Sequence, residues 1–356
     1  PPRSTLFPYT TLFRSIFFEV TDKYRGDLHG LSMKIIEGMI NSLKDKYSLL
    51  LDSKDYKELT DLLGKEMFSG FGFVPVIRDD FVYIASVFPD TPSSKAGLRE
   101  GDIIIEINGK KIAKMPLAEI YKLIPLEKGK SISLKIQRAE KKLEFSMKSE
   151  EIKIRDFTIE EIDKDILYIK VYFFASDTGK KIYNELSRLD IKKYKFSIID
   201  LRDNPGGELG SAIDFTRIFI SDEPVIMTEN NRGRKVIYGN NFSAISLPLA
   251  MLINNNTMSS AELVASCMKQ NNRAFLVGEK TYGKGSIQGL FPLDEHFAVR
   301  LTVAKFFTPS GEPIDDIGIK PDAEVTGYEK QFLYAIEYWN NILKAVEIIN
   351  HGKLTW

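Results

Sequence analysis

The 356-residue sequence is poor in the side chains that build disulfides and metal sites. It contains one cysteine, Cys267, and three histidines, His29, His296 and His351. A single thiol excludes an intramolecular disulfide, and neither a CxxC pair nor a Cys/His cluster is present to bind zinc. We therefore expect no metal and no other cofactor. Mechanisms that need several imidazoles are also disfavoured.

Net charge and long apolar runs are missing as well. Lys+Arg and Asp+Glu both total 49, so no global basic field exists to hold nucleic acid or an anionic membrane. No segment has the roughly 18 uninterrupted apolar residues that a membrane helix requires. With 43% hydrophobic and 28% charged residues, the sequence is typical of a globular protein with two or three domains. We expect its partners to bind at local sites, and nucleic acid not to be among them.

The beginning of the sequence is unusual. Residues 5–15 read TLFPYTTLFRS, which resembles the translation of a sequencing-library adapter. We expect residues 1–15 not to be native sequence. A signal peptide therefore cannot be looked for at this end, and the sequence itself does not determine the cellular compartment.

Four further segments differ in their patterns. Residues 16–67 are predicted to be a helical N-terminal segment, because apolar residues from Leu31 to Leu43 recur at three- and four-residue spacing. Residues 68–150 have short β-rich runs between turn signals, and residues 151–326 alternate strands with helices, which is typical of an α/β domain. Residues 327–356 are predicted to be a helical tail that could cap the domain or form a homodimer contact. The predicted strands are Phe81–Val87, Ile103–Ile107, Ile132–Ile136, Leu143–Met147, Ile166–Val171, Phe196–Leu201, Pro248–Ile253 and Ala274–Val277.

The β-rich segment resembles a PDZ domain. The resemblance lies in Phe71-Gly72-Phe73, in the stretch Ala96–Ile104 and in Ile107-Asn108-Gly109. A glycine-containing loop can turn its N–H groups toward a terminal carboxylate, while an exposed strand edge pairs with the peptide backbone. Phe71, Gly72 and Phe73 are therefore predicted to bind the free, apolar C-terminus of a protein or peptide. The alternative is that the glycines only supply turns in an ordinary β domain.

The α/β segment contains a serine in a helix-start pattern. Ser259 and Glu262 form a Ser-x-x-Glu capping box, which opens a helix predicted from Ala261 to Met268. A serine between a strand and a helix also exposes its Oγ beside unpaired backbone N–H groups, where an oxyanion can be held. The two roles can coexist. A nucleophilic serine needs a base, and no histidine or aspartate motif stands near enough to serve.

Lys284 is the remaining candidate for that base. A free lysine has a pKa of about 10.4, but burial among apolar groups disfavours the charge and can lower the pKa by several units. Lys284 lies between Gly283 and Gly285, which let other backbone segments approach closely. The alternative interpretation is a solvated turn residue.

The same lysine also belongs to most of a phosphate-binding loop. Gly278, Gly283 and Lys284 have the spacing of that motif, but Gly285 occupies the position of the Ser or Thr that binds magnesium. The next residues, Ser286–Pro292, read as loop or strand and not as the helix that would bind phosphate. We therefore expect no nucleotide binding.

Together these segments resemble the carboxy-terminal processing peptidases, or tail-specific proteases, which use a Ser-Lys dyad. Residues 200–207 (DLRDNPGG) and 301–311 share the resemblance, which extends from about residue 30 to residue 326. It implies a multidomain α/β fold with a crotonase-like serine protease core, an inserted β-rich PDZ domain and a helical N-terminal segment. It also implies an extracytoplasmic location, either periplasmic or membrane-associated.

The resemblance assigns roles to individual residues. Ser259, at the family's spacing before Lys284, corresponds to the nucleophile and Lys284 to the general base. Gln288 matches the glutamine that orients the lysine. The oxyanion hole would combine the backbone N–H of Ser260 with that of a glycine, either Gly206 or Gly207.

Three residues depart from the family pattern. Met258 and Ser260 are larger than the usual alanines, and Gln270 occupies a position that is often acidic. We predict a serine endopeptidase that recognises unstructured C-termini and cleaves near them. The alternative, suggested by Met258 and Ser260, is an inactive PDZ-bearing pseudo-protease that binds tails. A trypsin-like PDZ protease is disfavoured because no Gly-Asn-Ser-Gly-Gly motif is present.

Overall fold

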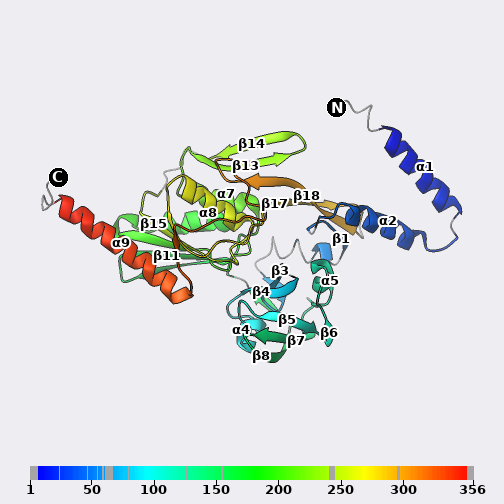
Figure 1. Ribbon diagram of the computed structural model, residues 1–356, viewed down its shortest axis with the longest axis horizontal. Coiled ribbons are helices and arrows are strands. Elements are labelled where there is room, and N and C mark those ends of the chain that lie inside the picture. The colour runs from blue at the N-terminus through cyan, green and yellow to red at the C-terminus, as the bar shows by residue number, and fades with distance from the viewer. Residues whose placement is uncertain are drawn as a thin grey trace.

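The computed structural model describes residues 7–350, apart from residues 24, 46, 54, 58, 59, 61–66, 79, 126, 154, 240–244, 295 and 296. The described chain consists of N-terminal helices, a β-rich domain and an α/β domain (Figure 1). Helix α1 (Phe7–Lys23) runs across the boundary at residue 15, and helix α2 (Leu28–Ser42) follows it.

The α/β domain is built on a six-stranded sheet. Its strand order is β10-β11-β12-β15-β16-β19; the β10–β11 pair is antiparallel and the other pairs are parallel. All residues of the central strands β12 and β15 are buried, as expected for parallel strands covered on both faces. The predicted strands in this domain are confirmed to within a residue or two. The bounds are β10 (Phe157–Ile162), β11 (Ile166–Val171), β12 (Phe196–Asp200), β15 (Leu249–Ile253), β16 (Phe275–Gly278) and β19 (Ala323–Glu324).

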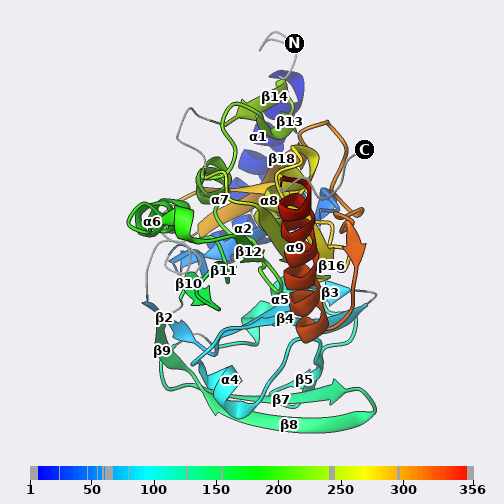
Figure 2. The ribbon, with the colours of Figure 1, turned by 90° about the vertical axis from the view of Figure 1, so that its left-hand side faces the viewer.

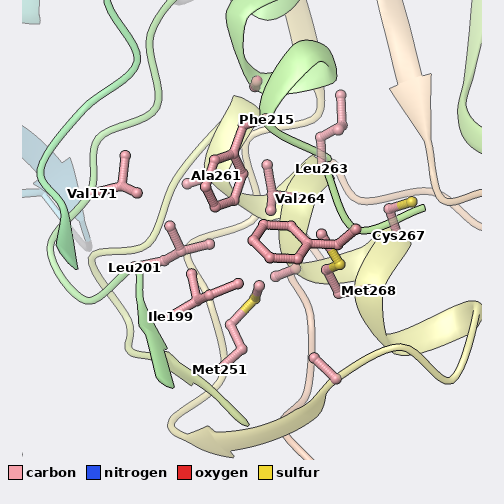
Figure 3. Close-up of a cluster of buried hydrophobic side chains, with 14 of the residues drawn as sticks. Val171, Ile199, Leu201, Phe215, Met251, Ala261, Leu263, Val264, Cys267 and Met268 are labelled. Carbon is pink, nitrogen blue, oxygen red and sulfur yellow. The ribbon is translucent and has the colours of Figure 1, made fainter. Parts of the chain in front are cut away.

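Helices cover both faces of this sheet (Figures 1 and 2). One face packs against α6 (Thr178–Leu186), α7 (Leu209–Arg217) and α8 (Ser260–Gln270), and a short 3-10 helix, η2 (Ile191–Lys193), precedes β12. Figure 3 shows Ile199 and Met251 of the sheet beneath Val264 and Met268 of α8. Because side chains alternate along a strand, the neighbours of these sheet residues face the opposite side.

The opposite face of the sheet is covered by helix α9 (Tyr328–Asn350). Ile198 and Ala250 of the sheet belong to the same buried cluster as Ala335 of α9, and Trp339 packs against it. The helix predicted after residue 327 therefore caps the domain. A dimer contact by the same segment stays a prediction, and residues 351–356 lie outside the described residues.

A second sheet is organised around the long strand β18 (Phe297–Phe307). Strand β17 (Ser286–Pro292) pairs with one side of β18, while β1 (Leu49–Asp52) and β13 (Pro224–Asn230) pair with the other; β14 (Gly233–Tyr238) extends the sheet from β13. The helical prediction for residues 16–67 holds for α1 and α2 but not for β1 or for Met67, which lies in a strand, and residues 61–66 lie outside the described residues. The apolar run at residues 49–51 is too short for a helix, and it pairs with the first residues of β18.

The β-rich domain is an insertion. Strand β2 (Met67–Gly70), which enters it, pairs antiparallel with β9 (Glu150–Lys153), which leaves it. Between them, the main sheet has the order β3-β4-β5-β7-β8, with β6 beside β5. The four strands predicted here are confirmed. The bounds are β3 (Phe73–Arg78), β4 (Phe81–Val87), α4 (Pro92–Ala96), β5 (Ile103–Ile107), β6 (Lys110–Lys111), α5 (Leu117–Lys122), β7 (Ser131–Arg138) and β8 (Lys141–Lys148).

Strands β3 and β4 of the β-rich domain pack against the α/β domain. Val76 and Ala85 of the β-rich domain form a small buried cluster with Met258, the residue before Ser259. At the end of β3, the Arg78 Nη2 donates a hydrogen bond to the backbone oxygen of Asn255 at 2.8 Å. The β-rich domain therefore contacts the loop that leads into α8.

Candidate active site

Ser259 lies at the turn between β15 and α8. It is the N-cap residue of α8 and has φ 56° and ψ −125°, a left-handed backbone that is strained for a residue with a side chain. The turn is held to the segment after β12, because the backbone N–H of Met258 donates to the backbone oxygen of Asn204 at 2.9 Å. Met258 and Ser260 are buried, whereas Ser259 is only partly buried. The sharp turn thus presents Ser259 at the start of α8.

The carboxylate of Glu262 connects Ser259 with the segment of Lys284. Oε2 accepts the backbone N–H of Ser259 at 2.9 Å and that of Lys284 at 2.7 Å. Oε1 accepts the backbone N–H of Gly283 at 2.6 Å and the Thr281 hydroxyl at 2.5 Å. The side chain of Glu262 is fully buried. Burial raises the pKa of this carboxyl, and the hydrogen bonds from Thr281 and the backbone act against that rise.

The sequence revealed only part of this role. The capping-box pattern correctly predicted that the Glu262 side chain would bind the Ser259 backbone. The second attachment, to residues 281–284, joins segments that are distant in sequence. The sequence signal for it is the run Thr281-Tyr282-Gly283-Lys284, three of whose residues donate hydrogen bonds to the Glu262 carboxylate.

Lys284 is partly buried between close backbone segments. Its Nζ lies 4.8 Å from the ring centroid of Tyr47, which provides an aromatic face for the amine. A Cβ atom on Gly285 would lie 2.6 Å from the backbone nitrogen of Asp315. The predicted close backbone approach beside Lys284 is therefore confirmed, and it leaves no room for a side chain at residue 285.

Gln288 lies on β17, four residues after Lys284. Its Nε2 donates to Ser286 Oγ at 3.0 Å and to Thr302 Oγ1 at 3.3 Å. These bonds fix the orientation of the amide. Its action on Lys284 stays a prediction.

The two glycines predicted for the oxyanion hole differ in what their N–H groups do. A Cβ on Gly206 would lie 2.8 Å from the Met258 oxygen, so only glycine fits against the turn that carries Ser259. The N–H of Gly206, however, already donates to Asn204 Oδ1 at 2.8 Å. Gly207 makes its contact through its carbonyl, which accepts the Ser260 Oγ at 3.4 Å. Of the two glycines, the geometry favours Gly207 as the N–H donor beside Ser260.

The residues predicted to bind substrate lie at the start of β3. The Phe71 side chain is 2% exposed and belongs to the core of the β-rich domain, so it can offer a ligand only its backbone. Gly72 has φ +82°, and a Cβ there would lie 2.3 Å from Thr91 Cβ. Phe73 is partly buried. Strand β3 runs from these residues to Arg78 and thus toward the loop before Ser259.

A buried polar cluster supports that loop from beneath. Asp203 Oδ1 accepts Asn254 Nδ2 at 2.8 Å and Asn256 Nδ2 at 3.0 Å. Burial raises the pKa of Asp203 to about 6, although Lys170 and the two asparagines act against the rise. Sequence analysis did not identify this cluster; its signal was the run of three asparagines after a buried strand.

A buried ion pair fixes the neighbouring segment. The Asp200 carboxylate accepts Arg202 Nη2 at 2.6 Å and Lys170 Nζ at 3.1 Å. Burial alone would raise the pKa of Asp200, but the two cations outweigh it and lower the pKa to about 2. Arg202 also donates to the backbone oxygen of Tyr328 at 2.7 Å, which ties α9 to this segment.

Two absences concern the described residues only. Among them, no group of three or more His, Cys, Asp or Glu side chains is arranged to hold a metal ion. In the same part of the chain, no helix combines the length and apolarity needed to cross a bilayer.

Gln270, which departs from the family pattern, lies on helix α8, the helix that Ser259 opens. Its side chain forms hydrogen bonds with the backbone N–H of Ser310 and with the carboxylate of Glu312.

Comparison with known proteins gives consistent matches. Residues 165–325 match the model of peptidase family S41, and residues 83–138 match that of a PDZ domain. The chain is 34% identical over 327 residues to a carboxy-terminal-processing protease of Bartonella bacilliformis, covering 88% of this chain and 74% of that protein. It is 33% identical over 300 residues to the carboxy-terminal processing protease CtpA of Bacillus subtilis, covering 83% of this chain and 64% of that protein.

A solved structure shows the same fold. The photosystem II D1 C-terminal processing protease superposes with a TM-score of 0.75 at 22% identity, covering 86% of this chain and 85% of that one. The match to a peptidase model in the α/β core and to a PDZ model in the inserted domain defines the class as a PDZ-containing peptidase. The chain belongs to the S41 peptidase family, among the relatives of the carboxy-terminal processing proteases. The predicted fold class and family are confirmed. The chain spans about two thirds of the length of these curated relatives.

Proposed function

We propose that the protein is a serine endopeptidase that holds a free, apolar C-terminus in its PDZ domain and cleaves nearby with Ser259 and Lys284. The observation that carries this proposal is the shared attachment of the two residues to Glu262 Oε2. Ser259 also has the strained backbone, at a helix start, that suits an exposed nucleophile.

The geometry supports a four-step reaction. Neutral Lys284 accepts the proton of the Ser259 hydroxyl while Oγ forms a bond to the scissile carbonyl carbon. The resulting oxyanion accepts hydrogen bonds from the backbone N–H groups of Ser260 and Gly207. The C–N bond then breaks and the Lys284 ammonium gives its proton to the departing amine, which leaves an acyl group on Ser259. Water, deprotonated by Lys284, attacks this ester, and the bond between the acyl carbon and Ser259 Oγ breaks. Oγ takes the proton back from Lys284, and the product leaves as a carboxylate.

Recognition of a chain end is supported by the PDZ match and by the shape of β3. Gly72 adopts the positive φ that turns a loop, and β3 then begins at the edge of the sheet. Backbone N–H groups of such a loop suit a carboxylate, and the edge suits an extended tail.

The inactive alternative was suggested by Met258 and Ser260. The Met258 side chain is 5% exposed and packs against Val76 and Ala85. Ser260 is buried and donates to the Gly207 carbonyl. Both larger residues are therefore accommodated while Ser259 stays accessible, and neither of them favours an inactive protein.

The proposal is tested with an unfolded reporter protein that ends in apolar residues. We expect Ser259→Ala and Lys284→Ala each to lower kcat by at least about 10³-fold, whereas the nearby exposed Lys280→Ala retains activity. Amidating the reporter's C-terminus is expected to raise KM. Turnover that survives Lys284→Ala would exclude the dyad. An intact chain that binds the tail without any turnover would establish the pseudo-protease.

A further inference from the structure

Strand β3 forms the open edge of the PDZ sheet (Figures 1 and 2). It pairs with β4 and stands at the end of the strand order within the described residues. The N–H of Phe88 donates to the Gly72 oxygen at 2.9 Å, so the Gly72 carbonyl points toward β4. Backbone groups alternate in direction along an extended strand, so Phe73, Pro75 and Ile77 turn theirs to the open side. A peptide that extends this sheet would have to pair with those three residues.

Two tyrosine hydroxyls already occupy carbonyls on that side. The hydroxyl of Tyr121, from α5, donates to the Pro75 oxygen at 3.4 Å. The hydroxyl of Tyr282, two residues before Lys284, donates to the Ile77 oxygen at 2.9 Å. Both contacts show that the Pro75 and Ile77 carbonyls point away from β4, as strand alternation requires. Tyr121 comes from the PDZ domain and Tyr282 from the α/β domain, so two separate elements cover this edge of the sheet.

Pro75 closes the edge further because it has no N–H. A strand that pairs with β3 at this position would leave one of its own carbonyls without a donor. At Ile77, the incoming strand would have to displace the Tyr282 hydroxyl. Of the three residues, Phe73 therefore offers both an N–H and a C=O whose oxygen carries no tyrosine hydroxyl.

We propose that the PDZ domain pairs with the backbone of a tail at its last residue only, opposite Phe73, and that β3 is closed to strand addition from Pro75 onward. This inference rests on the tail binding proposed above. With the terminal carboxylate at the Gly72 loop, the tail runs antiparallel to β3, so the third residue from its end faces Pro75 and the fifth faces Ile77. The carboxylate and the last one or two side chains then set the affinity. The substrates it selects are proteins with short free apolar ends, and a long extended tail adds nothing.

The test measures binding of labelled six-residue apolar peptides to the 356-residue chain carrying Ser259→Ala, by fluorescence anisotropy. N-methylation removes one backbone donor at a chosen position. We expect methylation of the last amide to weaken binding about fivefold or more, the effect of one lost hydrogen bond. Methylation of the third amide from the end, opposite Pro75, is expected to change the Kd less than twofold. Shortening the peptide to three residues is expected to have a similarly small effect.

A pair of substitutions should open the strand. Pro75→Val combined with Tyr121→Phe supplies an N–H and frees the carbonyl at residue 75. We expect this protein to bind the six-residue peptide about fivefold more tightly, without a gain for a two-residue peptide, which ends before it reaches residue 75. Its binding should become sensitive to methylation of the third amide. The exposed Tyr183→Phe serves as the matched control. Because the expected effect is a gain, a folding defect cannot imitate it.

The outcomes separate this inference from the proposed function. If amidating the C-terminus abolishes binding and methylation of the third amide weakens it as much as methylation of the last, the closed-edge inference is overturned while tail recognition stands. If amidation changes nothing, tail recognition fails, and the inference fails with it. Sensitivity confined to the carboxylate and the last amide supports both.

Discussion

The backbone N–H groups of Ser259 and Lys284 donate to the same carboxylate oxygen, Oε2 of Glu262. The turn at Ser259 and the loop at Lys284, which are distant in sequence, are thereby held next to each other. Because the carboxylate acts through backbone groups, Glu262 is a positioning residue for both members of the proposed dyad.

Glu262→Gln should damage catalysis more than binding. Whichever way the glutamine amide turns, its NH₂ faces backbone N–H donors that now bond to the carboxylate, either those of Ser259 and Lys284 or that of Gly283, so the backbone must shift. A displacement of about 1 Å at reacting groups can cost about 10²-fold in rate. We expect kcat to fall by about that factor, with KM changed less than about threefold. Steady-state kinetics check this split, and the exposed Glu312→Gln serves as the control. An unchanged kcat would contradict the positioning role.

Gly285→Ala should destabilise the protein and impair turnover. Its new Cβ would lie 2.6 Å from the backbone nitrogen of Asp315, so the backbone beside Lys284 must move. Overpacking of this kind costs about 1–3 kcal/mol. Gly38→Ala is the matched control, because its Cβ meets nothing within 4 Å in helix α2, and it should stabilise the helix by about 0.5–1 kcal/mol. Urea unfolding measures both; equal shifts in the two variants would refute the steric explanation.

Met258→Ala should loosen the contact between the domains. The side chain is 5% exposed in a cluster with Val76 and Ala85, and its removal should lower the free energy of unfolding by about 2 kcal/mol or more. We expect the amides of β3 to exchange hydrogen faster, whereas those of β7 stay protected. Hydrogen exchange by mass spectrometry gives the measurement. Met39→Ala, at an exposed position of α2, should leave both strands unchanged.

Asp203 should make stability depend on pH. Its pKa is about 6 in the folded protein against 3.8 as the ordinary value, because burial disfavours the charged form. The folded state therefore binds the proton more tightly, and the contribution of Asp203 to the free energy of unfolding declines as the pH rises from 3.8 to about 6. The full decline is on the order of 3 kcal/mol.

Asp203→Asn removes this titration and can keep the oxygen that accepts from Asn254 and Asn256. We expect the variant to gain stability relative to the parent between pH 4 and pH 8, as measured by urea unfolding at both values. The exposed Asp90→Asn should show no such gain. Parallel pH profiles for the parent and Asp203→Asn would contradict the prediction.

Local patterns predicted much of the fold. The strands in both domains follow from short apolar runs bounded by turn residues, and the Ser-x-x-Glu spacing placed Ser259 at the start of α8. The capping box indicated Ser259 and the flanking glycines indicated Lys284, while the resemblance to the carboxy-terminal processing peptidases implied their roles. Their catalytic roles, and that of Gln288, stay predictions.

The rest depends on contacts between distant segments. Strand β1 forms because β18 offers it an edge, and no pattern within residues 49–52 specifies that partner. The difference between Gly206 and Gly207 depends on one side-chain bond from Asn204. Likewise, the hydroxyl that donates to the Ile77 carbonyl belongs to Tyr282, a residue of the other domain. Each of these contacts is set by tertiary packing, which a single sequence does not encode as a local signal.

The burial of Cys267 has a practical consequence for studying motion between the domains. Its side chain is fully buried in α8, and burial raises the pKa of the thiol to about 12, so almost no reactive thiolate exists at neutral pH. Since this is the only cysteine, dyes or spin labels would attach selectively to cysteines introduced at exposed positions such as Lys110 and Glu329. The native thiol need not be removed first, so the helix that begins beside Ser259 stays intact while the distance between the PDZ and α/β domains is followed in solution.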